Sequence, residues 1–211
     1  TFNRDSVSLS DTDGKGVERI TEKGVVANGV EYEVDCIIFA TGFEVGTGYT
    51  RRAGYNVIGR EGVSLEEKWS DGMRTLHGIH THGFPNLFII SNSQAGFTTN
   101  FPHAMDETAQ HIGYILDQCK QDGIRAVEAT KDAEDEWVEH IISVARFGAD
   151  FQEACTPGYY NNEGQPNPKS VQNGPYGKGS RPYFRITKAW REEGSMAVSY
   201  THLTLPTTEA V

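Results

Sequence analysis

The alternation of hydrophobic and polar positions near the start of the chain predicts β-strands. Two β-prone runs flank the dipeptide Asn28–Gly29, which favours a two-residue hairpin turn because both central positions of such a turn need positive φ angles. The next segment, Val34 to Phe39, is an apolar run typical of a strand buried on both faces, as in a parallel sheet. A second run of this kind covers Leu87 to Ile90. Both runs end in small or polar residues.

Three later segments have the spacing of amphipathic helices. The first runs from about Pro102 to Cys119, and a proline suits the first helical turn. A second helix starts at Thr130, a possible N-cap followed by acidic residues near the positive end of the helix dipole. The stretch from Cys155 to Arg181 is rich in Gly, Pro and Asn and is expected to be mostly irregular loop. A short final helix is predicted around Ile186 to Glu193.

The two longer helices are expected to bury one side each. The apolar stripe of the first comprises Ala104, Thr108, Ile112, Ile115, Leu116 and Cys119. The stripe of the second comprises Ala133, Trp137, Ile141, Val144 and Ala145.

Composition restricts the class of protein. The chain has 211 residues, of which 37% are hydrophobic and 23% charged, which fits one globular domain or part of a larger protein. A formal net charge of −10 argues against a nucleic-acid partner, and no apolar run is long enough to span a membrane. The three cysteines are far apart and odd in number, which we interpret as reduced thiols in a cytoplasmic protein. No metal site is expected, because no histidine or cysteine spacing matches a metal-ligand motif.

The end of the first apolar run is a candidate binding position. In open α/β sheets, ligands bind at the carboxyl ends of parallel strands. Here the run ends in Ala40, Thr41 and Gly42, whose small side chains permit the close approach of a cofactor or of another backbone. A tight turn from strand to loop, without a ligand, explains the same residues, and the spacing alone favours this simpler interpretation.

Two further segments have the composition of a site. The stretch "NSQAGFTTNFPH", residues 92 to 103, leads into a helix start whose free backbone N–H groups can hold an anion or a polar ring edge. An ordinary helix capped by Thr99 or Asn100 is equally compatible with it. The loop "CTPGYYNNEGQ", residues 155 to 165, has two aromatic residues before two amides and can line a pocket, although a plain turn is favoured. We predict that Ala40 to Gly42 and Gln94 to Phe101 lie close together at one edge of one sheet.

The chain contains no complete GxGxxG phosphate-binding loop. The stretches "GKGVER" and "GKGSRP" both lack the third glycine. A complete dinucleotide-binding domain is expected to open with this loop after its first strand. The chain therefore has the strand ends of such a domain without its phosphate loop.

Several segments, in this order, resemble the C-terminal part of Baeyer–Villiger monooxygenases, which are flavoproteins with two dinucleotide-binding domains. They are "TFNRDSVSL", "GVEYEVDCIIFATGFEVGT", "FPNLFIISNSQAGFTTNFPHAMDETAQHIGYIL", "CTPGYYNNEGQ" and "YFRITKAWREEG". The resemblance runs from Thr1 to about Met196, and the asparagine-rich loop is its most specific part. It implies an α/β, Rossmann-like fold of the FAD/NAD(P)-binding kind, truncated at the N-terminus.

The resemblance also implies a division of the chain. Residues 1–58 would end the NADPH-binding domain and return the chain to the FAD-binding domain, of which residues 59–150 would form the C-terminal part. Residues 151–197 would form a loop-rich segment that lines the site. Residues 198–211 abandon the pattern of the family, resemble a translated sequencing-adapter sequence, and are expected to be a non-native tail outside the fold.

The chemistry implied by the resemblance uses FAD and NADP. NADPH reduces the flavin, and one oxygen atom of O₂ is then inserted into a ketone to give an ester or a lactone. The implied cofactor-binding residues are Ala40, Thr41, Gly42, Asn100 and Phe101. The implied substrate-pocket residues are Gln94, Ala95, Gly96, Phe97, Tyr160, Asn161 and Asn162. The arginine that such enzymes use in catalysis would lie upstream of Thr1, so no catalytic residue is assigned in this chain, which is expected to be inactive alone.

Two alternatives remain open. One is a flavin monooxygenase that oxygenates nitrogen or sulfur, against which the "CTPGYYNNEG" segment argues. The other is a nucleotide-binding module without catalysis, with which the missing phosphate loops agree. Some members of the family carry a tryptophan on a mobile loop, but "KSVQNGPYGKGSRPYF" contains none, which indicates a different subgroup. Trp190 is better interpreted as a packing residue of the last helix.

Overall fold

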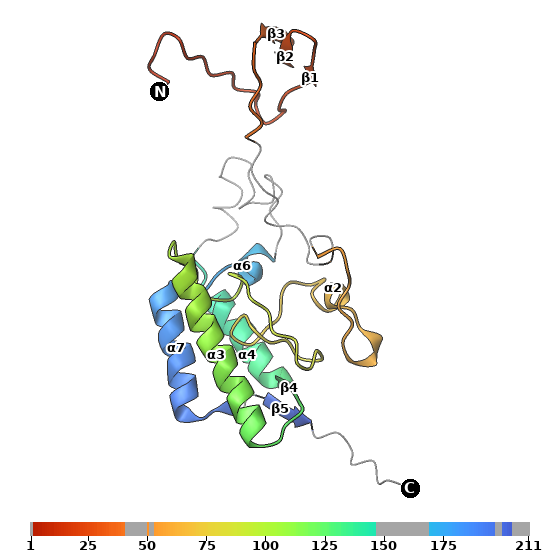
Figure 1. Cartoon of the computed structure of the whole chain (residues 1–211), viewed down its shortest axis with the longest axis vertical. Coiled ribbons are helices and arrows are strands. Elements are labelled where there is room, and N and C mark those ends of the chain that lie inside the picture. Colours follow the sequence, from red (N-terminus) through yellow and green to blue (C-terminus); the bar gives the residue numbers. More distant parts are fainter. Residues whose placement is uncertain (1, 41–49, 51–52, 147–168, 197–199, 204–211) are drawn as a thin grey trace. The chain divides into compact units, whose positions relative to one another are not determined.

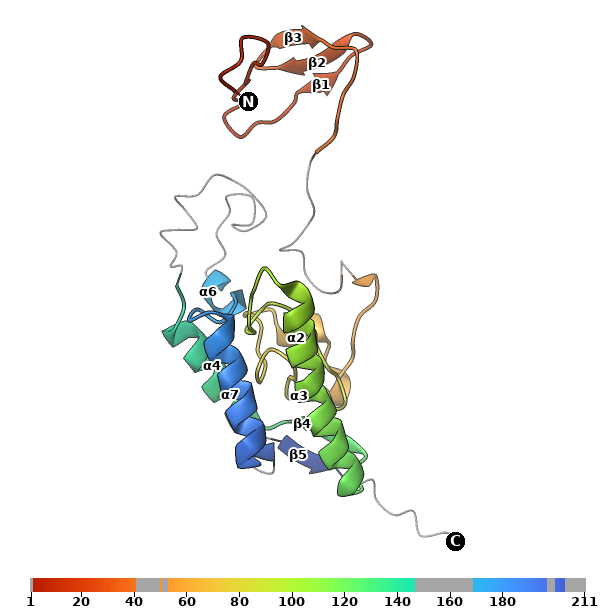
Figure 2. The same cartoon turned by 60° about the vertical axis from the view of Figure 1, so that its left-hand side comes forward.

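The computed structural model describes residues 2–40, 50, 53–146, 169–196 and 200–203 (Figures 1 and 2). The chain divides into two compact units, which are unit 1 (Thr1–Val45) and unit 2 (Gly46–Val211). Unit 1 contains a small sheet, whereas unit 2 contains the described helices and a two-stranded sheet. Among the described residues, no helix is both long and apolar enough to cross a membrane.

Unit 1 is built on a three-stranded antiparallel sheet. In spatial order its strands are β1 (Arg19–Ile20), β2 (Gly24–Ala27) and β3 (Val30–Glu33). Ala27 pairs with Val30 across a turn in which Asn28 and Gly29 have φ angles of 53° and 73°. A two-residue type I′ turn needs positive φ at both positions, so the predicted hairpin is confirmed.

The apolar run after β3 is not a strand. Residues 34–40 have no regular structure, and Ile38 and Phe39 are 85% and 70% exposed. A strand buried in a parallel sheet needs hydrogen-bonded neighbours and a packed layer on each face. The described residues of unit 1 form only the short antiparallel sheet, which does not bury this run. The prediction of a buried strand that ends at Ala40 is therefore wrong for this chain by itself.

The second apolar run, Leu87 to Ile90, is not a strand either. The buried Ile89 donates its backbone N–H to the carbonyl oxygen of Ile79 at 2.8 Å, but Ile90 is exposed. A single backbone bond to a neighbouring loop takes the place of a strand ladder, so the run packs on one side only. Without neighbouring strands to share its other hydrogen bonds, the predicted parallel strand does not form here.

The described residues of unit 2 include three long helices, and α3 and α7 lie side by side in both views (Figures 1 and 2). The long helices are α3 (Phe101–Gln121), α4 (Lys131–Ser143) and α7 (Ser180–Glu193). Shorter elements are η1 (Arg60–Gly62), α2 (Leu65–Lys68) and α6 (Ser170–Asn173). All three predicted helices are thus confirmed, although α7 begins earlier than expected, because Pro182 suits its first turn.

The ends of these helices follow from local side-chain chemistry. The side chain of Asn100 accepts the backbone N–H of His103 at 3.3 Å, and that of Thr130 accepts the N–H of Ala133 at 3.2 Å. Both are N-caps, which satisfy backbone donors that a helix start leaves unpaired. Helix α7 ends at Gly194, whose φ of 68° is the left-handed conformation that glycine adopts without strain. The predicted cap at Thr130 is therefore confirmed, and of the two residues considered for α3, Thr99 and Asn100, it is Asn100 that caps the helix.

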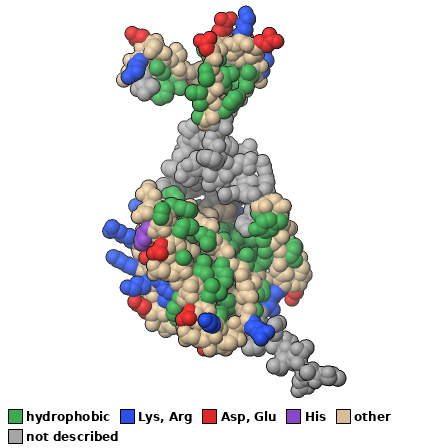
Figure 3. All heavy atoms as spheres, in the orientation of Figure 1, with side chains coloured by type: hydrophobic (Ala, Val, Ile, Leu, Met, Phe, Trp, Pro, Cys, Tyr) green, Lys and Arg blue, Asp and Glu red, His purple; other side chains and the backbone are tan. Residues whose placement is uncertain are grey.

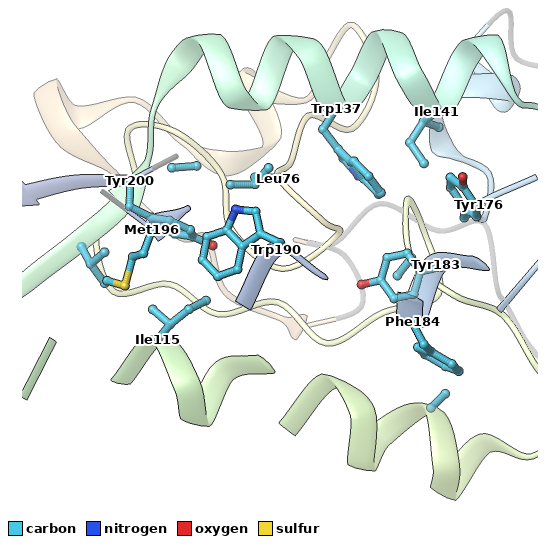
Figure 4. Close-up of a cluster of buried hydrophobic side chains, with 14 of the residues drawn as sticks. Leu76, Ile115, Trp137, Ile141, Tyr176, Tyr183, Phe184, Trp190, Met196 and Tyr200 are labelled. Carbon is cyan, nitrogen blue, oxygen red and sulfur yellow. The ribbon is translucent and has the colours of Figure 1, made fainter. Parts of the chain in front are cut away.

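The core of unit 2 lies between α3, α4 and α7 (Figure 4). Trp137 projects from α4 into a layer that also contains Trp190 and Tyr183 of α7, and Ile115 of α3 borders this layer from the other side. All four side chains are buried. Aromatic side chains of this size bury a large apolar area, which makes them the main hydrophobic contribution to packing in this unit. Trp190 is the packing residue that the sequence predicted.

A two-stranded antiparallel sheet lies beside the helices. It pairs β4 (Ala126–Ala129) with β5 (Tyr200–Leu203), with Ala129 opposite Tyr200. Tyr200 is only 3% exposed and belongs to the core cluster. The expectation that the chain from residue 198 onward lies outside the fold is therefore wrong for these four residues, because the edge of β4 offers backbone groups that a strand can pair with. Residues 204–211 lie outside the described residues.

A buried carboxylate joins a long loop to α4. Glu134 is buried, and its Oε1 accepts hydrogen bonds from the Thr81 hydroxyl and from the His82 backbone N–H, both at 2.8 Å. Its Oε2 accepts a hydrogen bond from Lys68 Nζ at 2.8 Å and lies 3.7 Å from Arg74 Nε. All four partners come from residues 68–82, so this carboxylate holds that loop against the helix.

Candidate functional site

The segment from Gln94 to Phe101 leads into α3 and contains most of the candidate residues that the structure describes. Gln94 is fully buried, with a φ of 55°. Its Nε2 donates to the carbonyl oxygens of Met73 at 2.6 Å and Gln172 at 3.0 Å, and its Oε1 accepts the Thr75 hydroxyl at 2.5 Å. The Gln94 amide therefore ties together separate loop segments, and its side chain faces the interior instead of a pocket.

Ala95 is buried, and Gly96 is small because α7 packs against it. The Ala95 carbonyl accepts the backbone N–H of Tyr176 at 2.9 Å. A Cβ atom on Gly96 would lie 2.6 Å from Tyr183 Cδ1 and 3.1 Å from Phe184 Cε1, which is closer than side chains tolerate. Packing thus explains why residue 96 is a glycine, and the approach of a ligand is not needed to account for it.

The start of α3 carries an available donor beside exposed aromatic rings. Asn100 donates its own N–H weakly to the Thr98 hydroxyl at 3.3 Å, while its side chain caps the helix. The N–H of Phe101 has no acceptor among the residues that the structure describes. No acidic side chain occupies the first turn, so the positive end of the helix dipole is not neutralised locally. The rings of Phe97 and Phe101 are about half exposed here.

The remaining candidate residues lie in unit 1 or outside the described residues. Ala40 is exposed in unit 1, whereas Gln94 to Phe101 belong to unit 2. Thr41, Gly42, Tyr160, Asn161 and Asn162 lie outside the described residues. That Ala40 to Gly42 and Gln94 to Phe101 lie close together at one edge of one sheet therefore stays a prediction.

A hydrogen-bonded relay of three side chains, which the sequence analysis did not single out, lies in the core of unit 2. Arg191 Nη1 lies 3.2 Å from His111 Nδ1, and His111 Nε2 lies 3.3 Å from His77 Nδ1. Because a guanidinium can only donate, His111 Nδ1 must accept, and His111 must carry its proton on Nε2. That proton is then donated to His77, which places the proton of a neutral His77 on Nε2.

Aromatic packing keeps both histidines uncharged. The His77 ring lies 4.8 Å from the Trp137 ring, and the His111 ring lies 5.0 Å from the Trp190 ring, measured between centroids. Burial lowers the pKa of His77 to about 3 and that of His111 to about 2, with a further lowering from the nearby Arg191 charge. Burial also lowers the pKa of His80 to about 3. These rings are therefore neutral, structural hydrogen-bonding groups at physiological pH.

Sequence reasoning missed the relay because its members are far apart in the chain. His77 and His111 are separated by 34 positions, and His111 and Arg191 by 80. The one available signal was the position of His111 on α3, where it shares the buried side with Ala104 and Ile115. A polar residue on an otherwise apolar helix face indicates a buried hydrogen-bond partner, but it does not identify that partner.

The described residues at the start of α3 fit one edge of a flavin ring system and no other part of the cofactor. The free Phe101 N–H at the positive end of α3 can donate to a polar ring edge, and the adjacent aromatic rings can contact a flat ring system. No glycine-rich phosphate loop occurs in the sequence, so the chain offers no such loop to a pyrophosphate. Within the described part of the chain, no three His, Cys, Asp or Glu side chains are placed to hold a metal ion.

The chain is similar to several monooxygenases over nearly its whole length. It is 51% identical to pentalenolactone D synthase of Streptomyces arenae over 93% of this chain and 34% of that protein. It is 44% identical to an FAD-binding monooxygenase of Hypomyces subiculosus over 92% of this chain and 32% of that protein. A Baeyer–Villiger monooxygenase of Stachybotrys chlorohalonatus is 39% identical over 92% of this chain and 31% of its own length. No family model matches the chain.

Solved structures show the same relationship. A polycyclic ketone monooxygenase from the fungus Thermothelomyces thermophila is 33% identical and superposes with a TM-score of 0.82, over 96% of this chain and 33% of that one. A steroid monooxygenase bound to NADP is 25% identical with a TM-score of 0.77, over 97% of this chain and 36% of that one. The chain thus spans about a third of the length of the relatives that it matches. In sequence and in fold it therefore resembles about a third of proteins that are named as FAD-binding and Baeyer–Villiger monooxygenases.

Proposed function

We propose that the protein to which this chain belongs uses FAD and NADPH to insert one oxygen atom of O₂ into a ketone, forming an ester or a lactone. The observation that carries this proposal is the 51% identity to pentalenolactone D synthase, which extends over 93% of the chain. Support for the cofactors comes from a relative named as FAD-binding and from a structural neighbour bound to NADP. Support for a ketone substrate comes from a neighbour bound to cyclohexanone, and support for a lactone product comes from a neighbour bound to ε-caprolactone.

In this proposal the described residues position the flavin and exclude water from it. FAD, when bound, carries electrons from NADPH and activates O₂ for the transfer of one oxygen atom. The Phe101 N–H and the positive end of α3 would hold a polar edge of the ring system. The rings of Phe97 and Phe101 would shield that edge from solvent. The Asn100 cap, the Gln94 amide and the contact of Gly96 with Tyr183 keep this segment in place.

The chain alone is expected to bind no FAD and to leave NADPH unoxidised. Flavoproteins of this class hold the pyrophosphate with a glycine loop and a helix N-terminus, and the chain has no such loop. Each lost charge-assisted hydrogen bond removes roughly 1.5–3 kcal/mol, so the affinity falls by several orders of magnitude. Flavin absorbance of the purified chain measures this directly. If the purified chain alone contained stoichiometric FAD, the binding energy for FAD would reside in this chain and not in a pyrophosphate-binding loop.

The activity itself is testable in a chimera. The upstream two-thirds of the Streptomyces arenae relative would be joined in frame to this chain, and NADPH consumption would be followed with cyclohexanone and with a polycyclic ketone. We expect ketone-dependent NADPH consumption and a product one oxygen atom heavier than the substrate, with an ester carbonyl. An aryl methyl sulfide and a tertiary amine test oxygenation at sulfur and at nitrogen. A chimera that contains FAD and oxygenates these two compounds but no ketone would contradict the proposal.

A further inference from the structure

A small hollow lies on the surface of unit 2 between α3 and α7. Its volume is about 350 Å³, and it is lined by Gln110, Tyr114, Lys188, Arg191 and Glu192. The first two side chains come from α3, and the others come from α7. Because Arg191 also begins the histidine relay, this hollow is the place where the buried relay meets the surface.

The hollow lies along one edge of the buried side of α3. This helix buries Ala104, His111, Ile115 and Cys119. At about 100° per residue, Gln110 and Tyr114 lie at one edge of that side, and Leu116 lies at the other edge. Leu116 is 50% exposed, so the prediction that it belongs to the buried stripe is wrong for this residue.

The guanidinium group of Arg191 carries a charge that no neighbouring carboxylate balances. Arg191 is half-buried, and its Nη1 donates to His111 Nδ1 at 3.2 Å. This bond holds the guanidinium in place without neutralising it, because the accepting His111 ring is uncharged. Among the residues that the structure describes, no acidic side chain forms an ion pair with Arg191. Its remaining N–H donors therefore need acceptors from outside the chain.

The acidic side chains around the hollow already have partners. Glu192 lies 3.7 Å from Lys188 Nζ, one turn away on α7. Asp106 accepts a hydrogen bond from Gln110 Nε2 at 2.8 Å, one turn away on α3. Each carboxylate is thus engaged along its own helix, and neither reaches across to Arg191.

The charge around α7 is opposite in sign to that of the chain as a whole. The formal net charge of the chain is −10, but residues 169–191 contain six Lys or Arg and no Asp or Glu. Figure 3 shows Lys and Arg side chains along the side of unit 2 where α7 lies. Salt screens charges beyond about 8 Å at physiological ionic strength, so the nearby basic residues dominate the potential at the hollow.

We propose that this hollow binds the carboxylate or phosphate group of a small organic anion, with Arg191 as its main contact. A guanidinium presents its donors in a planar fork, which fits either group with two parallel hydrogen bonds. The bond to His111 orients this fork before any ligand arrives, which reduces the entropy lost on binding. Lys188 and Tyr114 carry further donors at the wall of the hollow. The inference does not depend on the proposed oxygenation of a ketone.

Water is the alternative occupant of the hollow. The exposed donors of any surface arginine bond to water, and such a group shows no preference among anions beyond the effect of ionic strength. A built anion site differs in two ways, because it saturates and because it prefers an anion that can accept two hydrogen bonds. Comparison of different anions at constant ionic strength therefore separates the two cases.

An NMR titration of the ¹⁵N-labelled chain tests the site directly. Phosphate, acetate and chloride are added at constant ionic strength, and the Nε–H signal of Arg191 is followed, with Arg191→Lys to assign it. We expect a saturable shift with phosphate or acetate at millimolar concentration and none with chloride. The tighter of the two binding anions identifies the ligand group. Arg185 is the internal control, because it is exposed on the same helix and does not line the hollow. If Arg191 and Arg185 respond alike, or if neither signal saturates, the hollow holds only water and loosely associated ions, and the proposal is wrong.

Two matched pairs of variants test the role of each charge, with the affinity read from backbone amide signals around the hollow. Arg191→Lys keeps the charge but loses the fork, so it should weaken the binding of the preferred anion by about tenfold. Arg185→Lys makes the same change outside the hollow and should stay within about twofold of the unmodified chain. Equal affinity of these two variants would overturn the proposal.

The second pair does not touch the relay, so it decides the question even if Arg191→Lys fails to fold. Glu192→Gln releases Lys188 from its ion pair and removes a negative charge from the hollow, and it should strengthen binding by about threefold or more. Glu193→Gln changes the net charge equally but does not line the hollow, and it should stay within about twofold. If Glu192→Gln and Glu193→Gln have the same affinity, the anion does not bind in this hollow.

Discussion

The Glu134 carboxylate is expected to be a main determinant of the stability of unit 2. The substitution Glu134→Gln keeps the volume of the side chain and removes its charge. The Gln carbonyl oxygen can still accept from the Thr81 hydroxyl and the His82 N–H, which now bond to Oε1 at 2.8 Å. The Gln NH₂ group, however, would face the ammonium group of Lys68, which now donates to Oε2 at 2.8 Å. Two donors would then oppose each other in a place where water has little access.

The size of the effect follows from the bonds that are weakened. Hydrogen bonds to charged groups contribute roughly 1.5–3 kcal/mol and neutral ones about 1 kcal/mol, so Glu134→Gln should lower the free energy of unfolding by about 3 kcal/mol. For a chain of this size, that corresponds to a fall in Tm of about 6 to 12 °C. The side chain of Lys68 is 18% exposed, so partial rehydration of its ammonium group reduces the loss.

Thermal unfolding followed by circular dichroism measures the loss, with Glu139→Gln as the control. Glu139 lies on the same helix and is exposed, and its substitution makes the same change in net charge. We expect Glu139→Gln to change stability by no more than about 0.5 kcal/mol. A double-mutant cycle with Lys68→Met should give a coupling energy of at least about 1 kcal/mol. If Glu134→Gln and Glu139→Gln melt within about 2 °C of each other, the network does not stabilise the unit as argued.

Two further predictions concern the helix cap and the histidine relay. Asn100→Ala should lower the free energy of unfolding by about 1 kcal/mol, whereas Asn100→Asp should not, because its side chain still accepts the His103 N–H. Urea unfolding measures the stability of the two variants. Equal stability of both would argue against the cap. The folded-state pKa values of His77 and His111 are about 3 and about 2, below the usual 6.5, so the unfolded chain takes up protons first as the pH falls. Stability should be fully present above about pH 6.5 and should fall by about 1.4 kcal/mol per pH unit for each histidine between about pH 6 and pH 3. His111→Gln should make this dependence shallower, and an unchanged slope would mean that the His111 ring is not kept neutral by the fold.

Local patterns were sufficient for the elements that depend on neighbouring residues. The Asn28–Gly29 turn, the caps at Asn100 and Thr130 and the courses of the long helices depend on backbone preference and on side chains a few positions away. The apolar runs at Val34 to Phe39 and Leu87 to Ile90 show the opposite case. Their sequences favour buried strands, but a strand exists only if other strands accept its hydrogen bonds, and the residues that the structure describes do not provide such strands.

The candidate site was only partly determined by the sequence. The segment that leads into α3 was found from its small residues and its helix start, yet tertiary packing decided what each residue does there. Gln94 faces inward because loop carbonyls converge on its amide, and Gly96 is small because Tyr183 lies against it. The relay from Arg191 to His77 depends on residues far apart in the chain. The sequence alone determines which residues prefer a turn, a cap or an apolar surface, whereas the partner of a buried polar group depends on which distant segments the fold brings together.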